Sequence, residues 1–530
     1  MAETLAPSST TDLIHDLFWA GLSAVLLTLS FPSPDLGFLA WVALVPLMIR
    51  ARSIRPGRGF RLGWFAGVLH FGGLVYWVSV TVHQYGGIPL AAGVAALVLL
   101  SLYLGLYLAL FSWGVGRWTL PWPLMMLLAP SLWVTLEYAR TFLVTGFPWG
   151  LLGYSQHQLT PLIQMADITG VYGVSFLVVM GNTALAAVIS SRKERFKEAL
   201  IPLGVFLGVA GAVLGYGSKE LKTIKEAQAK APSLAVGVLQ GNIDQSKKWD
   251  DAFRGDTLTI YETLAKEALA QKPDLMVLPE TALPFYYLRD KRETLRVNQM
   301  MAQGDADWIV GAPAAEPEGL GWRFYNRAYA VSSKGALMGA YDKVHLVPFG
   351  EYVPLADLLF FIEKLVVAAG NFSAGEKGSI IQGQRGDKIW RAGGQICFES
   401  IFPELSVASV RSGANLLVNL TNDAWFGRTG APFQHLQMAR FRAIETRRSL
   451  IRSANTGISG FVLPTGELVG ATALYETAWR VAKVPMLDRK SLYVRFGDLF
   501  AWICMGMTLL LGLRGEVLRR RFQREKRVSL

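Results

Sequence analysis

The sequence predicts a bundle of membrane-spanning helices that carries one large α/β domain ahead of its last helix. Hydrophobic residues make up 52% of the 530 residues, and the mean hydropathy is +0.32, above the composition of a typical soluble domain. Residues 12–217 and 492–514 are almost continuously apolar, whereas residues 218–490 have an ordinary globular composition. We therefore expect seven transmembrane helices within residues 1–217, a folded domain over 218–490, and an eighth helix with a basic tail over 491–530.

Eight apolar segments are long enough, or nearly so, to cross a bilayer as helices, since a span needs about 20 residues. The predicted spans lie near residues 14–33, 37–50, 62–83, 88–114, 121–139, 167–190, 199–216 and 492–513. The second is short, so we expect it to be tilted or to form a hairpin with the first around Phe31-Pro32-Ser33-Pro34. Residues 1–11 contain no Lys or Arg, unlike an ordinary signal peptide, so the first span is expected to stay as an anchor.

Basic residues gather in three segments on one side of the predicted membrane. Loop 50–61 carries a net charge of +5, loop 191–198 carries +2, and tail 514–530 carries +5, which together equal the whole net charge of +12. The charge therefore indicates membrane orientation and argues against a nucleic-acid partner. The positive-inside rule places both termini in the cytoplasm and the 218–490 domain outside it. In a bacterium, this predicts a multi-pass protein of the inner membrane with a periplasmic domain.

Two features stand out within the apolar half. Glu137 and Arg140 lie one helical turn apart in an apolar run, which predicts a structural ion pair, with a role in substrate handling as the alternative. The stretch Thr145-Gly146-Phe147-Pro148-Trp149-Gly150 is predicted to be a turn at the outer surface, where its aromatic residues would suit the headgroup layer.

Residues 218–490 alternate short apolar runs with helical patterns, which predicts a layered α/β domain. Strands are predicted at 233–240, 274–279, 307–312, 324–331, 336–341, 393–398, 415–420, 449–454 and 459–463. Helices are predicted at 251–271, 288–303, 400–411 and 432–448. Pro464-Thr465-Gly466 is a predicted turn between two late strands.

Three of the predicted strands end in residues that carry chemistry. Glu280 follows the run 274–279, Lys343 follows 336–341, and Cys397 lies at the end of 393–398. Cys397 has no expected disulfide partner, because the other cysteine, Cys504, lies in the hydrophobic C-terminal run. A free cysteine is most often a small buried apolar residue. Together, however, the three residues offer a base, a cation and a nucleophile.

In this order and with these flanks, Glu280, Lys343 and Cys397 resemble the Glu-Lys-Cys triad of the carbon–nitrogen hydrolase (nitrilase) superfamily. The resemblance is closest to its membrane branch, the apolipoprotein N-acyltransferases. It is supported by the stretches 240–243 with Trp249, 279–282, 345–351 and 422–427, by the number of spans and by the 145–150 turn. One departure is Phe398, where relatives often have tyrosine, so a hydroxyl role there is absent or supplied elsewhere.

The resemblance implies an αββα sandwich and a two-step acyl transfer that needs no metal or cofactor. Glu280 would take the thiol proton, Cys397 would attack the sn-1 ester of a phospholipid, and Lys343 with a backbone N–H near Phe398 would stabilise the oxyanion. The resulting thioester would acylate the α-amine of the diacylglyceryl-cysteine that begins an apolipoprotein. The implied partners are thus the phospholipid donor, the diacylated apolipoprotein acceptor and the bilayer.

Further residues gain expected roles from the same resemblance. Glu351 and Glu399 are expected to position Lys343 and the thiol, with a plain salt bridge as the alternative for each. Trp249 and Trp425 are expected to line the acyl path, although without the resemblance both would be read as core aromatics.

Two further hypotheses concern neighbours of these residues. His345 raises the alternative of a Cys–His pair, which is disfavoured because Glu280 already supplies a base and His345 lies in the loop of the lysine. The very apolar stretch 355–369 is either a lid that dips into the leaflet and admits acyl chains or a buried helix.

Two other functions compete with acyl transfer. A membrane-tethered amidase or nitrilase would use the same triad with water as the acceptor, but a soluble substrate needs neither the spans nor the apolar stretch. A transporter or receptor would need charged or broken spans along a path, and it would leave the triad unexplained.

Overall fold

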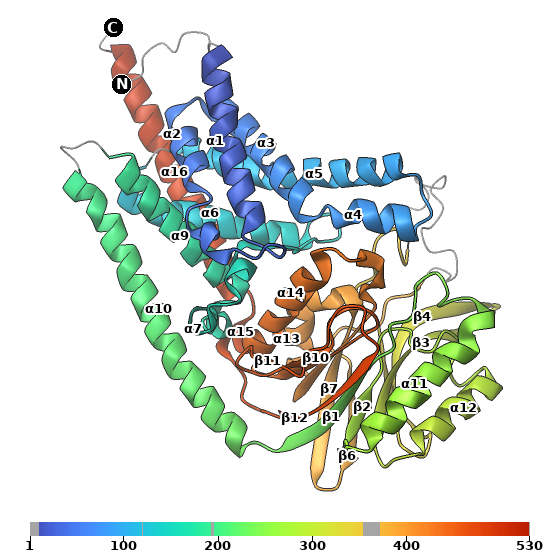
Figure 1. Ribbon diagram of the computed structural model, residues 1–530. Coiled ribbons are helices and arrows are strands. Elements are labelled where there is room, and N and C mark those ends of the chain that lie inside the picture. Colours follow the sequence, from blue (N-terminus) through green and yellow to red (C-terminus); the bar gives the residue numbers. More distant parts are fainter. Residues whose placement is uncertain (1–9, 119, 192–195, 353–371, 529–530) are drawn as a thin grey trace. The chain divides into compact units, whose positions relative to one another are not determined.

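The computed structural model describes residues 10–118, 120–191, 196–352 and 372–528 (Figure 1). The chain divides into two compact units. Unit 1 comprises residues 1–79, 94–218 and 498–530, and unit 2 comprises residues 80–93 and 219–497. The second unit is thus an insertion before the last helix, together with one short segment from the N-terminal half.

Unit 1 is built from helices. Its elements are α1 (Thr10–Leu29), η1 (Gly37–Trp41), α2 (Val45–Ser53), α3 (Pro56–Leu74), most of α4 (Trp77–Val80), most of α5 (Leu90–Arg117), α6 (Trp122–Phe142), η3 (Leu152–Gln156), α7 (Thr160–Ile163), α8 (Ala166–Thr169), α9 (Val171–Ile189), the first part of α10 (Phe196–Lys230) and α16 (Leu499–Val528). Leu47, Phe111, Leu128 and Val179, from four of these helices, meet in one buried cluster.

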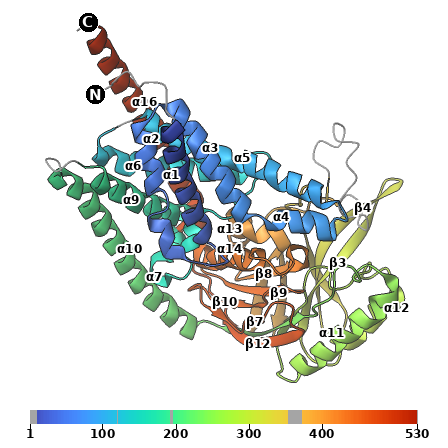
Figure 2. The ribbon, with the colours of Figure 1, turned by 45° about the horizontal axis from the view of Figure 1, so that its top comes forward.

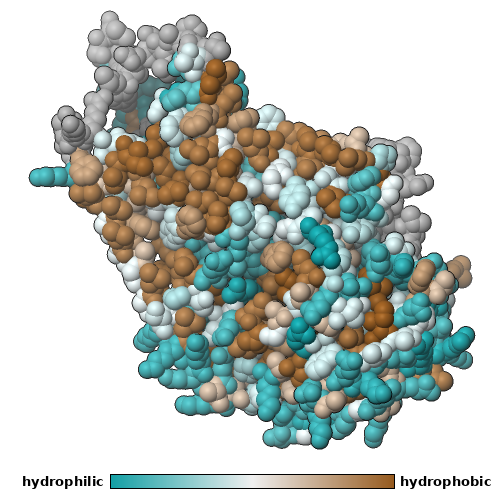
Figure 3. All heavy atoms as spheres, viewed as in Figure 1, coloured by the Kyte–Doolittle hydropathy of each residue, from teal (hydrophilic) through white to brown (hydrophobic). Residues whose placement is uncertain are grey.

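Among the described residues, five helices are long and apolar enough to cross a membrane. They are 11–29, 90–117, 171–189, 199–230 and 499–525, and a sixth span results if 56–74 and 77–85, bent by 52° at their break, count as one. Leu99, Leu207 and Leu510 on these helices are 67%, 58% and 68% exposed, and hydrophobic residues cover much of the unit 1 face seen in Figure 3. The two remaining predicted spans coincide with η1 plus α2 and with α6, so the count of eight stays a prediction.

The buried charges of α6 are held by main-chain groups. Glu137 Oε1 accepts a hydrogen bond from the N–H of Leu152 at 2.6 Å, and Arg140 Nη1 donates to the carbonyl of Trp149 at 2.9 Å. The hydrogen-bond partners are therefore in the 149–152 segment, in place of the direct ion pair predicted between these two residues. Trp149 itself is fully buried and packs on Trp77 with ring centroids 4.7 Å apart, so it is a core residue of unit 1 and not the surface aromatic that we expected.

Unit 2 contains two six-stranded sheets. The first has the order β12-β1-β2-β3-β4-β5 and the second β11-β10-β9-β8-β7-β6. The strands are β1 (Ser233–Gln240), β2 (Leu275–Val277), β3 (Asp307–Glu318), β4 (Gly321–Val331), β5 (Leu337–Asp342), β6 (Ile380–Arg385), β7 (Lys388–Ile396), β8 (Leu416–Thr421), β9 (Ser449–Ala454), β10 (Gly460–Val462), β11 (Leu468–Val469) and β12 (Ala478–Pro485).

Helices cover the outer face of each sheet, as Figures 1 and 2 show. They are α11 (Arg254–Leu269), α12 (Lys291–Met301), α13 (Pro403–Arg411), α14 (Ala431–Thr446) and α15 (Leu492–Phe496); the short elements are η2 (Thr81–Tyr85), η5 (Asp251–Phe253), η6 (Cys397–Ile401) and η7 (Asp423–Phe426).

Three apolar layers hold unit 2 together. In the first outer layer, Leu264 of α11 and Val297 of α12 pack on Val310 of the first sheet. The central layer lies between the sheets and contains residues of both, such as Val236, Ile309, Val418 and Ile451. In the second outer layer, Val410 of α13 and Ala443 of α14 pack on Leu417 of the second sheet. This is the expected αββα sandwich.

All nine predicted strands of this domain are present, and three further strands were missed. β6, β11 and β12 lie at the sheet edges. Polar and apolar residues do not alternate clearly in these segments, so hydrogen bonding to the neighbouring strand decides that they are strands. β12, for example, exists because it pairs antiparallel with β1 along its full length, from Ser233 opposite Pro485 to Gln240 opposite Ala478.

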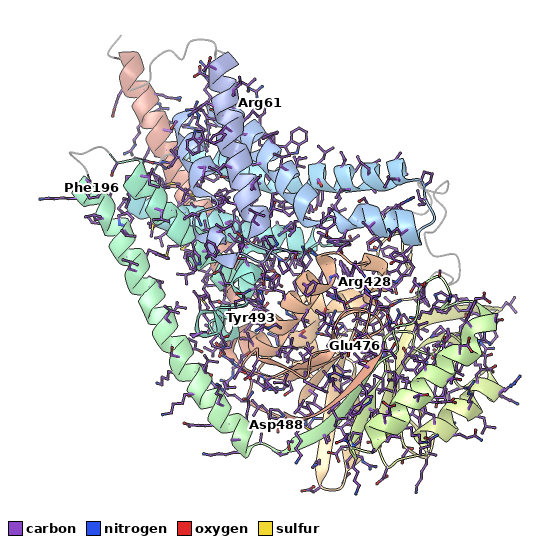
Figure 4. All side chains as sticks on the ribbon, viewed as in Figure 1. Arg61, Phe196, Arg428, Glu476, Asp488 and Tyr493 are labelled. Atoms are coloured by element: carbon purple, nitrogen blue, oxygen red, sulfur yellow. The ribbon has the colours of Figure 1, made fainter. Side chains whose placement is uncertain are left out.

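The chain then returns to the second sheet. Arg391 of β7 donates to the exposed Asp488 at 3.2 Å, while Tyr493 of α15 is buried (Figure 4).

Parallel pairing decides where the site forms. β1 runs parallel to β2 and β2 to β3 in one sheet, and β7 parallel to β8 and β8 to β9 in the other. The hydroxyl of Ser453, near the carboxyl end of β9, donates to the carbonyls of Leu239 and Val277 at 3.1 Å each. The carboxyl ends of the two sheets therefore meet, and loops from both converge there.

Candidate active site

Cys397 lies on a sharp turn where β7 ends. Its φ of +54° is in the left-handed region, which a residue with a side chain adopts only when the surroundings hold it there. The residue is 9% exposed. The turn continues directly into η6, so the thiol stands at the carboxyl end of a buried strand.

Glu399 holds this turn and the neighbouring loop together. Its Oε1 accepts hydrogen bonds from the backbone N–H of Val344 (2.6 Å) and of His345 (2.9 Å), and its Oε2 accepts from the N–H of Ile396 (2.6 Å) and the hydroxyl of Tyr341 (3.0 Å). Burial raises the pKa of Glu399 to about 7, and the backbone donors oppose that rise. One buried carboxylate thus fixes the loop of Lys343 against the turn of Cys397.

Lys343 lies between two carboxylates. Its Nζ is 2.9 Å from Glu351 Oε2 and 3.6 Å from Glu280 Oε1. The amide nitrogen of Asn326 donates to Oε1 of both acids, at 2.8 Å for Glu280 and 3.0 Å for Glu351. Burial alone would lower the pKa of Lys343, but Glu351 and then Glu280 outweigh it and raise the pKa above its ordinary value. The ammonium is therefore charged at neutral pH.

The thiol is protonated when the site is at rest. Burial, reinforced by the Glu280 carboxylate, raises the pKa of Cys397 to about 12, although Lys343 acts in the opposite direction. A thiol of this kind needs a base at the moment of attack. Within the described part of the chain, Oε2 of Glu280 is buried and has no hydrogen-bond partner, so it is available to accept a proton.

A buried polar network behind the turn was missed from the sequence. His435 Nε2 lies 3.1 Å from the carbonyl oxygen of Cys397 and 2.8 Å from Ser400 Oγ, and its Nδ1 lies 3.0 Å from Asp423 Oδ1. Asp423 Oδ2 accepts from Arg452 Nη2 at 2.7 Å. Burial would raise the pKa of Asp423, but Arg452 and His435 hold it below its usual range. The available signal was an arginine, the one charged residue of the predicted strand 449–454.

The structure gives His345 a different surrounding from the one a Cys–His pair requires. Its ring stacks on Phe402 with centroids 3.8 Å apart, and its backbone N–H donates to Glu399 Oε1. Phe398 packs edge-on against the same Phe402 ring at 5.3 Å. His345, two residues after Lys343, and Phe398, directly after Cys397, therefore pack on one phenylalanine ring beside the turn.

The two candidate tryptophans are both half-buried. Trp425 lies in η7, where its carbonyl accepts from Thr81 Oγ1 at 2.8 Å and its ring meets Tyr85 edge-on at 6.0 Å. Trp249 follows the buried Lys248 in the loop after β1. The predicted lid or helix at 355–369 lies outside the described residues. Among the residues that are described, no group of three or more His, Cys, Asp or Glu side chains could hold a metal ion.

Comparisons with known proteins agree on both halves of the chain. Residues 23–184 match the model of the apolipoprotein N-acyltransferase N-terminal domain, and residues 235–491 match the carbon–nitrogen hydrolase model.

Similar proteins extend over nearly the full length. An apolipoprotein N-acyltransferase of Geobacter metallireducens is 43% identical over 494 residues, which are 93% of either chain. One of Nitrosomonas europaea is 33% identical over 89% of this chain and 91% of its own. A solved amidase of the nitrilase superfamily from Nesterenkonia aligns with 51% of this chain and 98% of its own, at 21% identity and a TM-score of 0.37. The two full-length relatives, at 43% and 33% identity, show that the chain belongs to the apolipoprotein N-acyltransferase family.

Proposed function

We propose that the protein transfers the sn-1 acyl chain of a phospholipid, through a thioester on Cys397, to the N-terminal α-amine of diacylated apolipoproteins. The observation that carries this proposal is the buried cluster of Glu280, Lys343 and Glu351 beside a cysteine held at positive φ. Such a cluster supplies a base, a fixed positive charge and a nucleophile, which are the parts that acyl transfer requires.

The first half-reaction forms the thioester. Glu280 takes the proton of the Cys397 thiol while the sulfur attacks the ester carbonyl. The ammonium of Lys343 and a backbone N–H near Phe398 stabilise the oxyanion of the tetrahedral intermediate. The carbon–oxygen bond then breaks, the departing alkoxide takes the proton from Glu280, and a lysophospholipid leaves.

The second half-reaction forms the amide. The neutral α-amine of the acceptor attacks the thioester carbonyl, and Glu280 takes a proton from the nitrogen. The carbon–sulfur bond then breaks, and Glu280 passes the proton that it took from the amine to the thiolate of Cys397. The enzyme thereby returns to its starting state. Glu351 and Glu399 act by positioning Lys343 and the turn.

A membrane setting suits both substrates, because each is anchored in a lipid leaflet and reaches a site facing that leaflet at high local concentration. We place the catalytic domain in the periplasm, with eight spans of the inner membrane and both termini in the cytoplasm. Trp249 and Trp425 would line the path of the acyl chain and help keep water from the thioester.

The proposal is tested by incubating the purified protein with a phospholipid whose sn-1 chain is isotopically labelled, without an acceptor. Mass spectrometry of the peptide that contains Cys397 should show one labelled acyl group, and the Cys397→Ala variant should show none. Addition of a diacylated lipopeptide should discharge the label into an amide.

Two outcomes would contradict acyl transfer. If the adduct forms but only water discharges it, the protein is a lipase-like hydrolase. If no adduct forms and small amides are hydrolysed instead, the membrane-tethered amidase is the better assignment.

A further inference from the structure

A second lysine is buried near the base and the nucleophile. Lys248, in the loop after β1, is 3% exposed, and its Nζ donates to the main-chain carbonyl of Glu280 at 3.0 Å. Its neighbour Lys247 is exposed and lies over the ring of Phe253, 5.1 Å from the centroid. Of two consecutive lysines, one is solvated and the other is directed into the site.

Lys248 differs from Lys343 in its partners. Lys343 has a carboxylate oxygen at 2.9 Å and another at 3.6 Å. No carboxylate oxygen in the described part of the chain lies within 4.0 Å of Lys248 Nζ. A buried ammonium that no carboxylate contacts directly is only partly compensated, here by the more distant Glu280 carboxylate, so it can balance further negative charge that develops in the site.

The charge balance of the site indicates the source of that negative charge. Two carboxylates, Glu280 and Glu351, face one ammonium, Lys343, so this cluster already carries an excess of negative charge. Deprotonation of Cys397 adds a further negative charge. The anionic forms of Glu280 and Cys397 both favour the charged form of Lys248, although burial outweighs them and lowers its pKa to about 8.

The hydrogen bond of Lys248 also meets a strained point of the backbone. Thr281, the residue after the accepting carbonyl, has a φ of +44°. The same turn fits closely against Gly311, where an added Cβ would lie 2.9 Å from the Cα of Glu280. The lysine therefore fastens the turn that aims the Glu280 side chain.

We propose that Lys248 is a second cationic residue of the acyl-transfer site, which positions the Glu280 turn and balances the negative charge that develops on Cys397 and the bound ester. The inference rests on the function proposed above and deepens it. It assigns a positioning role to Lys248 and leaves contact with the oxyanion to Lys343.

The test uses Lys248→Gln, which can keep the hydrogen bond but lacks the charge, with Lys247→Gln as the matched control. The rate of Cys397 alkylation by iodoacetamide is measured on the full-length protein from pH 6.5 to 9.5 by peptide mass spectrometry. We expect the wild type to react about tenfold faster than Lys248→Gln at pH 6.5, which corresponds to one pKa unit. The ratio of the wild-type rate to the Lys248→Gln rate should fall towards one above pH 8, as Lys248 loses its proton. Lys247→Gln should follow the wild type throughout.

A rate ratio of one at every pH, in a variant that melts like the wild type, would overturn the proposal. If Lys248→Gln does not fold, Lys248→Arg is compared with the wild type. The two should react at the same rate at pH 6.5, and Lys248→Arg should react up to about tenfold faster above pH 8, because arginine keeps its charge there. Equal rates of the two at every pH would contradict the role of Lys248. The labelled phospholipid is offered to the same variants. If the expected alkylation rates are found but the wild type forms no acyl-enzyme, the proposed function is refuted. If Lys248→Gln is acylated at the rate of the wild type, only the role of Lys248 is refuted.

Discussion

At the scale of single residues, the site depends on carboxylates that accept several hydrogen bonds at once. Glu351 is the clearest case, because it accepts from Lys343, from Asn326 and from the N–H of Val347 at 2.9 Å. A carboxylate with three donors fixes both the direction and the charge of the lysine beside it.

Glu351→Gln should therefore slow acylation of Cys397 by about 100-fold. The amide would direct its own N–H groups at the donors that surround Glu351, and Lys343 would lose its ion pair and shift. The measurement is the rate of thioester formation with the labelled phospholipid. Glu318→Gln is the control, because Glu318 is 55% exposed and pairs only with Arg323 among the described residues. Equal rates in both variants would show that Lys343 needs no positioning.

Asp423→Asn should destabilise the folded protein by about 3–5 kcal/mol, because it leaves Arg452 and His435 buried without their anion. The pKa of Asp423 is depressed in the fold, so its contribution is present above the unfolded pKa of about 4 and is lost as the pH falls further. The Tm difference from the wild type should be constant from pH 5 to 8 and shrink below pH 4. Asp488→Asn, at an exposed pair, should leave Tm unchanged; a similar loss in both variants would contradict this account.

At the scale of elements, β7 delivers the nucleophile only because its neighbours fit tightly around it. Gly394, three residues before Cys397, packs directly on the Tyr341 ring, and a Cβ there would lie 2.5 Å from Tyr341 Cγ. The same tyrosine donates to Glu399. The strand, the ring and the carboxylate therefore form one continuous support for the turn.

Gly394→Ala should move Tyr341, destabilise the protein by about 1–3 kcal/mol and reduce acylation, because an overpacked core relaxes by shifting its neighbours. Thermal unfolding and thioester formation are the two measurements. Gly321→Ala serves as the control, since its Cβ would come no closer than 3.7 Å to its first neighbour. If Gly394→Ala acylates at the normal rate, Tyr341 does not support the turn.

At the scale of the whole molecule, the chain combines apolar helices with a polar sandwich domain, and the proposed topology places that domain outside the cytoplasm. The test uses single cysteines introduced into a Cys397→Ala, Cys504→Ser background. Asp387→Cys, in the exposed β6–β7 turn, should react with a membrane-impermeant maleimide in cells with a permeabilised outer membrane. Arg55→Cys, in the basic loop 50–61, should react only after lysis. The reverse pattern would invert the topology.

Local pattern was sufficient for the main elements of the sandwich. The apolar runs before Glu280, Lys343 and Cys397 predict strands, and each of these residues does follow or end one. Periodicity and strand-end chemistry are properties of neighbouring residues, so the sequence by itself determined the two-part architecture, most strands and the candidate triad.

Only the tertiary structure decided how those residues are partnered. Nothing in their local sequence distinguishes Lys248 from Lys247, and the difference arises because the Lys248 side chain reaches the carbonyl of Glu280 in the loop after the neighbouring strand β2. Asp423 and Arg452 form a buried pair only when β8 and β9 align. Burial and electrostatic partners depend on segments far apart in the chain, and so they exist only once the fold has brought those segments together.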